Sequence, residues 1–267
     1  MSQHSIKSFS AALFKKSFYL AFVNIFIYFK SPVKILIRYI FEVGDYPKNI
    51  YVRTPLALQC VTAFSHHDLI TTIECFGKLD YKAPKNCSVV VDFGSNIGIS
   101  AFYFLTRNQN VKVYLFEPVP RNIERLKKNL KDFEERYELR GCAVGVKNEY
   151  LDFACDDTGR YGGLINEGAE HFSQWTSNKI ISVEVLSAND SLDKILKRHP
   201  FIDILKIDVE GYENKILNHL KKNILECISR IYAETEADQK ISGFSSKRYG
   251  GIARYYRIEN SFEAKPD

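Results

Sequence analysis

The sequence of 267 residues predicts an α/β protein of the doubly wound type, with a mainly parallel sheet and an N-terminal helical arm. Two observations lead to this class. From residue 88 onward, short apolar runs that are typical of buried strands alternate with amphipathic helical patterns, which indicates βαβ units. Before that point, an apolar and basic segment at 6–41 has the pattern of a helical arm. The composition, 45% hydrophobic and 26% charged, excludes a disordered or fibrous chain.

The charges divide the chain into unequal parts. Residues 1–41 carry six Lys or Arg and no Asp or Glu, whereas residues 42–267 carry 31 basic and 32 acidic residues. The nearly neutral body argues against a general nucleic-acid-binding surface. We therefore separate a basic arm at 1–41 from a lead-in segment at 42–86 and a main domain at 87–267.

The arm is expected to be helical and to lie on an anionic membrane surface. An apolar run at 17–29 is followed by Ser31 and Pro32, where a second helix should start because proline suits the first helical position. No apolar run reaches the roughly 18 residues of a membrane-spanning helix. Rival interpretations are a cleaved signal peptide and an arm that packs on the body or on a second copy. In this region three basic residues recur every four positions and would form one narrow basic stripe on a helix, namely Lys30, Lys34 and Arg38.

The lead-in segment predicts a helix and no metal site. Ser65 and Asp68 fit a capping box before a helix that should end near Gly77. Because the cap explains Asp68, we do not assign the neighbouring His66 and His67 to a metal ion. The six cysteines form no CxxC pair, which argues against zinc and is typical of reduced thiols in the cytoplasm.

The main domain alternates between strands and helices. Strands are expected at 88–93, 111–117, 137–144, 149–155, 181–186, 201–208, 227–235 and 252–258. Helices are expected at 99–107, 121–131, 191–199 and 212–223. Ser191 is the expected cap of the third helix, and the Gly-rich polar stretch at 158–168 is expected to be a loop.

The strongest signal is the motif VVVDFGSNIGIS at 89–100. An apolar strand ends in Asp92, and a glycine turn with Gly94 and Gly98 leads into a helix, which is the architecture of a nucleotide-type crevice. A dinucleotide fingerprint would have glycine where Asn96 stands, since pyrophosphate must touch the backbone there. Asp92 would repel a pyrophosphate but attract an ammonium group. S-adenosylmethionine (SAM) has an ammonium group and an adenosine but no phosphate, so the motif favours SAM.

Two further strand ends carry carboxylates. Glu117 ends the next strand and could accept hydrogen bonds from both ribose hydroxyls of an adenosine. The run ILKIDVEGYE at 204–213 contains a strand that ends at Asp208. If that strand neighbours the first one, Asp208 and Glu210 face the same crevice as Asp92 and could orient and deprotonate an acceptor hydroxyl. The alternative is that Asp208 and Glu210 cap the following helix.

Together the motifs VVVDFGSNIGIS, LFEPVP, VEVLSANDSLDKIL and LKIDVEGYE resemble the FkbM-type methyltransferases, a branch of the class I SAM-dependent enzymes. The resemblance implies a seven-stranded Rossmann-like sheet and methyl transfer, usually to oxygen. The acceptors that it implies are hydroxyls of sugars, glycan precursors or related small molecules. The residues expected to bind SAM are Asp92, Gly94, Ser95, Asn96, Gly98, Glu117, Cys142, Ala143 and Asp208, with Cys142 and Ala143 near the adenine.

Two other functions stay open at this point. An NAD(P)-dependent oxidoreductase would use the same type of sheet, although Asn96 and Asp92 argue against it. A non-catalytic membrane-surface module would not need the carboxylates at three strand ends. We therefore expect a cytoplasmic SAM-dependent O-methyltransferase without a nucleic-acid partner, with Asp208 and Glu210 as its catalytic residues and with peripheral membrane contact through residues 6–41.

Overall fold

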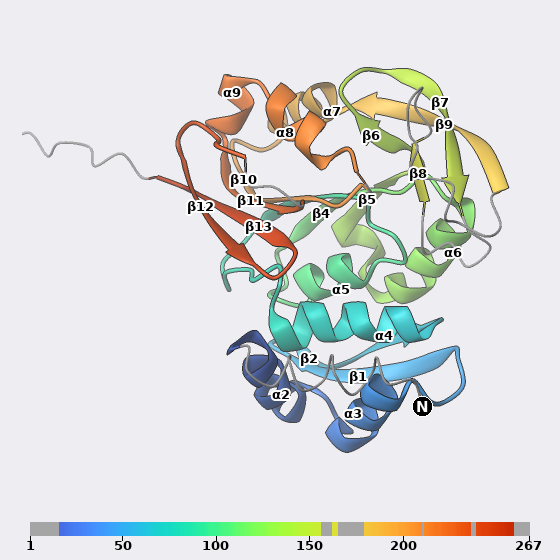
Figure 1. Ribbon diagram of the computed structural model, residues 1–267. Helices are drawn as coiled ribbons and strands as arrows, with labels where there is room; N and C mark the ends of the chain where they lie inside the picture. Colours follow the sequence, from blue (N-terminus) through green and yellow to red (C-terminus); the bar gives the residue numbers. More distant parts are fainter. Residues whose placement is uncertain (1–15, 156–161, 165–178, 210, 236–238, 259–267) are drawn as a thin grey trace, which may run out of the picture.

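The computed structural model describes residues 16–155, 162–164, 179–209, 211–235 and 239–258. A central sheet lies between two layers of helices, and a helical arm with a hairpin covers one end of the molecule (Figure 1). The α/β class and the mainly parallel, doubly wound sheet predicted from the sequence are confirmed.

The central sheet has seven strands in the order β12-β13-β11-β10-β3-β4-β5. All neighbours from β11 to β5 pair in parallel, and only β13 runs antiparallel to its two neighbours. The strand order reverses between β3 and β10, so their carboxyl ends form the switch point where such sheets bind ligands. The strands are β3 (Val89–Phe93), β4 (Lys112–Phe116), β5 (Tyr137–Arg140), β10 (Ile202–Ile207), β11 (Ile228–Glu234), β12 (Phe244–Tyr249) and β13 (Ile252–Arg257).

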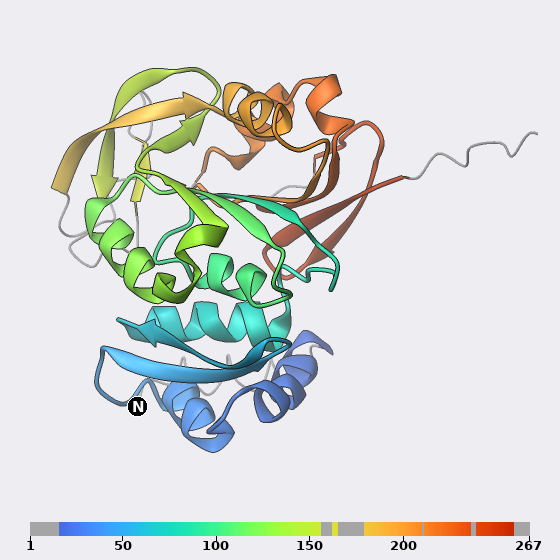
Figure 2. The same cartoon turned by 180° about the vertical axis from the view of Figure 1, so that it is seen from behind.

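Both faces of the central sheet are covered, which explains the uninterrupted apolar run of β3. Val90 packs into one hydrophobic core, and Val89 and Val91 pack into the other. The helices α5 (Ile99–Leu105) and α6 (Pro120–Asn129) lie on one face. The opposite face is covered by α7 (Ala188–Leu196), α8 (Glu213–His219) and α9 (Lys222–Leu225), as Figure 2 also shows.

A second, four-stranded sheet has the order β6-β9-β7-β8. Its strands are β6 (Ala143–Gly145), β7 (Glu149–Cys155), β8 (Gly162–Leu164) and β9 (Lys179–Ser187). The single strand predicted at 137–144 is therefore wrong, because the chain leaves the central sheet after β5 and joins the second sheet as β6. The predicted cap of α7 is also wrong. The Ser187 hydroxyl accepts the hydrogen bond from the Asp190 N–H, and Ser191 is buried inside the helix.

Two helices, α2 (Lys16–Tyr28) and α3 (Pro32–Phe41), form the described part of the arm. They are followed by a hairpin of β1 (Lys48–Thr54) and β2 (Ala57–Ala63), which was not predicted from the sequence. The next helix, α4 (His66–Ile73), has the predicted cap, since the Ser65 hydroxyl accepts from the Asp68 N–H. The chain continues as η1 (Glu74–Lys78) and turns at Leu79, not at Gly77.

The described part of the arm packs on the body of the protein, as one of the rival interpretations held. Ile25 of α2 and Phe29, which directly follows this helix, are buried in the same core as Val52 of β1 and Leu69 of α4. The Asn24 side chain donates a hydrogen bond of 2.6 Å to the carbonyl of Gly77. Within the described residues, none of the helices combines the length and apolar character needed to span a bilayer.

Phe29→Ala should lower the free energy of unfolding by about 3–5 kcal/mol, because it empties a site in which the ring is 0% exposed. The matched control is Phe26→Ala, three residues earlier on α2, where the side chain is 46% exposed and the change should stay near about 0.5 kcal/mol. Urea denaturation followed by circular dichroism measures both. Equally small effects would mean that the arm does not belong to the core.

Candidate functional site

The candidate site lies at the carboxyl ends of β3, β4 and β10. Asp92 is on β3, Glu117 directly follows β4, and Asp208 directly follows β10. Parallel pairing of β3 with β10 places Lys206 opposite Asp92, and the N–H of Asp208 donates to the carbonyl of Phe93. The structure therefore brings together the three carboxylates that the sequence analysis singled out.

A buried lysine joins two of these carboxylates. Lys206 is 2% exposed, and its Nζ lies 3.0 Å from Oδ1 of Asp92 and 3.2 Å from Oδ2 of Asp208. Nζ also donates a hydrogen bond of 2.9 Å to the carbonyl of Gly94. Burial alone would lower the pKa of Lys206, but the charges of Asp208 and Asp92 outweigh it and raise that pKa. Lys206 is thus held in its charged form at the switch point.

Asp92 lies behind the crevice and does not form its surface. Its side chain is 0% exposed, and both carboxylate oxygens have partners inside the protein. Oδ1 pairs with Lys206, and Oδ2 accepts a hydrogen bond of 2.6 Å from the Ser100 hydroxyl. Burial raises the pKa of Asp92, while Lys206 and Ser100 act in the opposite direction. Asp208, by contrast, has a side chain that is 27% exposed and can reach the crevice.

The turn after β3 has the tight geometry that its glycines predicted. Gly94, Asn96 and Gly98 all have left-handed backbones, with φ of 79°, 46° and 81°. A side chain at Gly94 would collide with the backbone of Asp208, so only glycine lets the turn pass this close to the end of β10. The buried Ser95 ties the turn to β4, since its hydroxyl donates to the carbonyl of Asp92 and accepts from the N–H of Phe116.

The carboxylate of Glu117 accepts hydrogen bonds from this turn and from the segment after β4. Its Oε2 accepts a hydrogen bond of 2.9 Å from the N–H of Asn96, and its Oε1 accepts from the N–H of Val119 and the side-chain amide of Asn122. Burial raises the pKa of Glu117 to about 7. A carboxylate has room for about four such bonds, so these three leave capacity for a hydroxyl of a ligand.

The predicted adenine-side residues lie beside Glu117. The Glu117 N–H donates a hydrogen bond of 3.1 Å to the carbonyl of Arg140, the last residue of β5. Cys142 and Ala143 follow after Gly141, and both are buried with small side chains. This segment therefore continues the edge of the crevice that begins at the turn.

One predicted site residue lies outside the described residues, and one residue that shapes the loop after β10 was not predicted. Glu210, the second predicted catalytic residue, lies outside the described residues. The carboxylate of Glu213 accepts hydrogen bonds from the N–H groups of Val209 and Gly211 and so holds the loop after β10. The N-cap of α8 is Tyr212, so the interpretation of Asp208 as that cap is not supported.

The lead-in segment also contributes to the site. Tyr81 is buried, and its ring centroid lies 5.4 Å from Nζ of Lys206, in the range of a cation–π contact. Nothing in the sequence pattern pointed to Tyr81. A signal for Lys206 did exist, because a lysine inside the apolar run of β10 must find charged partners when the strand is buried.

The residues present fit SAM. The turn lacks side chains at Gly94 and Gly98, Glu117 has room for a hydrogen bond from a hydroxyl, and the side chains of Cys142 and Ala143, where the adenine is expected, are small. No pyrophosphate is needed for this fit, and Asn96 stands where a pyrophosphate would need a glycine. Within the described ranges, no group of three or more His, Cys, Asp or Glu side chains could hold a metal ion.

Lys206→Met should lower the free energy of unfolding by about 3–5 kcal/mol near pH 8, because it leaves Asp92 as an uncompensated buried charge. The loss should be smaller near pH 5, since a buried carboxyl with a raised pKa takes up a proton in the folded state and the buried charge disappears.

The double variant Asp92→Asn/Lys206→Met removes both charges and should recover much of the loss near pH 8. Urea denaturation at the two pH values measures all three proteins. An equal loss at both pH values, without recovery in the double variant, would contradict the proposed ion pair.

Comparison with known proteins agrees with this geometry. The methyltransferase FkbM domain matches residues 92–258, which is more than half of the chain. The comparison with curated proteins finds no match.

Several solved structures align with the chain. A methyltransferase from Geobacter sulfurreducens is 16% identical, with 65% of this chain and 73% of that chain covered and a TM-score of 0.38. M. capricolum TrmK, in complex with S-adenosyl-homocysteine, is 11% identical, with 67% and 66% covered and a TM-score of 0.35. M. jannaschii TYW2, in complex with AdoMet, is 12% identical, with 81% and 90% covered and a TM-score of 0.34. On the match over residues 92–258, the chain belongs to the FkbM methyltransferase family, and its cofactor is SAM.

Proposed function

We propose that this SAM-dependent methyltransferase transfers the methyl group to a hydroxyl of a sugar, a glycan precursor or a related small molecule. The observation that supports it most is the position of Asp208, a partly exposed carboxylate at the switch point. A carboxylate there can orient an acceptor hydroxyl and take its proton. The methyltransferase family argues against an NAD(P)-dependent oxidoreductase, which the same type of sheet could have served.

Glu117 is proposed to bind a ribose hydroxyl of SAM, and Cys142 and Ala143 to border its adenine. When bound, SAM supplies an electrophilic methyl group on a sulfonium. The turn residues Gly94, Ser95, Asn96 and Gly98 are proposed to follow the amino-acid part of the cofactor. Asp92 would act from behind, because it positions Lys206 and Ser100 beneath that turn.

Asp208 is proposed to meet the acceptor. Its Oδ2 pairs with Lys206, while Oδ1 has no ion-pair partner within the described part of the chain. Oδ1 is therefore the atom proposed to accept the proton of the acceptor hydroxyl, with Glu210, two residues further along the chain, as a second carboxylate. Most of the rate acceleration would come from positioning in a prearranged polar site.

The proposal extends to the domain boundaries, the size of the acceptor and the location of the enzyme. Residues 87–267 would form the methyltransferase domain, preceded by the lead-in at 42–86 and the arm at 1–41. A body with 31 basic and 32 acidic residues favours a small acceptor over nucleic acid. We propose a cytoplasmic enzyme that is peripheral at a membrane through residues 6–41.

Glu117 should make SAM affinity depend on pH. Only the ionised carboxylate accepts a ribose hydroxyl well, so with a pKa of about 7 the affinity should rise as the pH increases from 6 to 8, by about tenfold. Glu117→Gln should weaken binding near pH 8 by about tenfold, since it loses a charge-assisted hydrogen bond, and should remove this share of the pH dependence. Calorimetry measures both effects, with exposed Glu124→Gln on α6 as the control. An unchanged pH dependence in Glu117→Gln would refute the assignment.

Asp208→Asn should lower the rate of methyl transfer at saturating SAM by roughly 10²–10⁴-fold. Transfer from methyl-labelled SAM to a panel of monosaccharides, lipid-linked sugars, small phenols and RNA measures the activity and identifies the acceptor class. Asp193→Asn, on the outer side of α7, is the control and should keep the wild-type rate. Label in RNA alone would overturn the proposed acceptor, and full activity of Asp208→Asn would overturn its role.

A further inference from the structure

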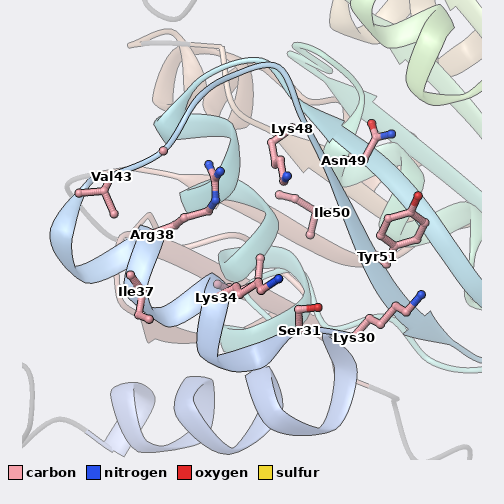
Figure 3. A pocket seen from close by; sticks show the side chains of 12 residues that line it. Lys30, Ser31, Lys34, Ile37, Arg38, Val43, Lys48, Asn49, Ile50 and Tyr51 are labelled. Carbon is pink, nitrogen blue, oxygen red and sulfur yellow. The ribbon is translucent and has the colours of Figure 1, made fainter.

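A basic pocket lies between the arm and the hairpin that follows it, on the opposite side of the molecule from α7, α8 and α9 (Figure 1). It is a cavity of about 660 Å³ between α3 and the start of β1. Among the described residues that line it there is no Asp or Glu, and Figure 3 shows Arg38 and Lys48 extending into the space between the two elements. The four cations of its wall are Lys30, Lys34, Arg38 and Lys48.

Local contacts hold two of these cations at the pocket. Arg38 lies over the ring of Tyr46, 5.5 Å from its centroid, and donates a hydrogen bond to the carbonyl of Asp45. A side chain at Gly44 would collide with the guanidinium of Arg38, so glycine leaves room for it. Lys30 lies 5.2 Å from the ring centroid of Tyr51. The pocket is therefore a prearranged cluster of positive charge.

An apolar surface borders this pocket. Of the fifteen large hydrophobic side chains that are exposed in the described residues, nine lie between Tyr19 and Val43. On α3, Val33, Ile37 and Phe41 recur every four residues and are 45–58% exposed. They form a stripe next to the basic stripe, while the buried Ile35 faces the core. On α2 the exposed members are Tyr19, Leu20, Phe22, Phe26 and Ile27.

We infer that this surface docks on a bilayer that contains anionic phospholipids, with a headgroup phosphate in the basic pocket and the apolar stripes in the interfacial region. A helix with an apolar face and a basic edge is the established pattern for lying in such an interface. The inference deepens the proposed peripheral location by naming the described residues that make the contact. It does not depend on the methyl-transfer reaction.

The positive charge of the pocket and its apolar border favour a bilayer over a second copy of the chain or a nucleic acid. A symmetric dimer through this face would bring the four cations of one copy close to those of the other, with no carboxylate among the residues that line the pocket to offset them. Nucleic acid would satisfy the cations but would leave the nine apolar side chains against a polar partner. An anionic lipid surface satisfies both at once, since each Lys or Arg near it contributes to attraction and the apolar groups leave water.

Vesicle co-sedimentation of the full-length protein tests the inference. Wild type should sediment with vesicles of phosphatidylcholine and phosphatidylglycerol, and much less with phosphatidylcholine alone. Lys34→Glu/Lys48→Glu should weaken binding to the mixed vesicles by at least about 30-fold. The control with the same net charge, Lys222→Glu/Lys247→Glu, reverses two lysines that lie outside the arm and should bind like wild type.

A second pair of variants tests the apolar stripe. Val33→Ser/Ile37→Ser should reduce vesicle binding by about tenfold or more, whereas Phe201→Ser, at an exposed ring outside the arm, should not. Light scattering after size exclusion reports the oligomeric state of each protein, and calorimetry with inorganic phosphate reports binding of the free anion. Equal binding by both double charge variants, a dimer that only the arm variants dissociate, or phosphate binding without vesicle binding would each overturn the inference.

Discussion

The crevice depends on one buried cation. Lys206 has three N–H donors, and it meets three acceptors: the carboxylates of Asp92 and Asp208 and the carbonyl of Gly94. These acceptors come from two neighbouring parallel strands and from the turn that follows one of them. Without a positive charge between them, the two carboxylates would repel each other at the point where β3 and β10 meet. A lysine in the middle of the sheet therefore determines how closely the elements of the crevice approach.

The contacts around Lys206 divide the carboxylates into distinct roles. Asp92 is enclosed and stabilises the turn from behind, whereas Asp208 keeps one side toward the crevice. Glu117 receives the N–H of Asn96 on the far side of the same turn. Each buried polar group in this set has a partner, which favours a single rigid arrangement because an unpaired group would be costly here. A rigid rim of this kind suits catalysis by positioning.

The sequence predicted the part of this site that depends on strand order. Carboxyl ends of adjacent parallel strands meet at one edge, so three acidic strand ends could be brought together without coordinates. The role of Lys206 could not be predicted, because facing partners depend on the register of β3 against β10. The chain's departure from the central sheet after β5 was missed, since an apolar run does not show which sheet its residues join. The packing of α2 was also undecided, because an apolar helix suits a protein core as well as a lipid surface.

We expect the crevice at the ends of β3, β4 and β10 to bind SAM and to have no place for a pyrophosphate. Calorimetric titration of the full-length wild-type protein with SAM, and separately with NAD⁺, tests that claim most directly. The wild-type protein should show saturable binding heat with SAM, competition by S-adenosyl-homocysteine, and no binding heat with NAD⁺. Saturable binding of NAD⁺ together with no binding of SAM would contradict it.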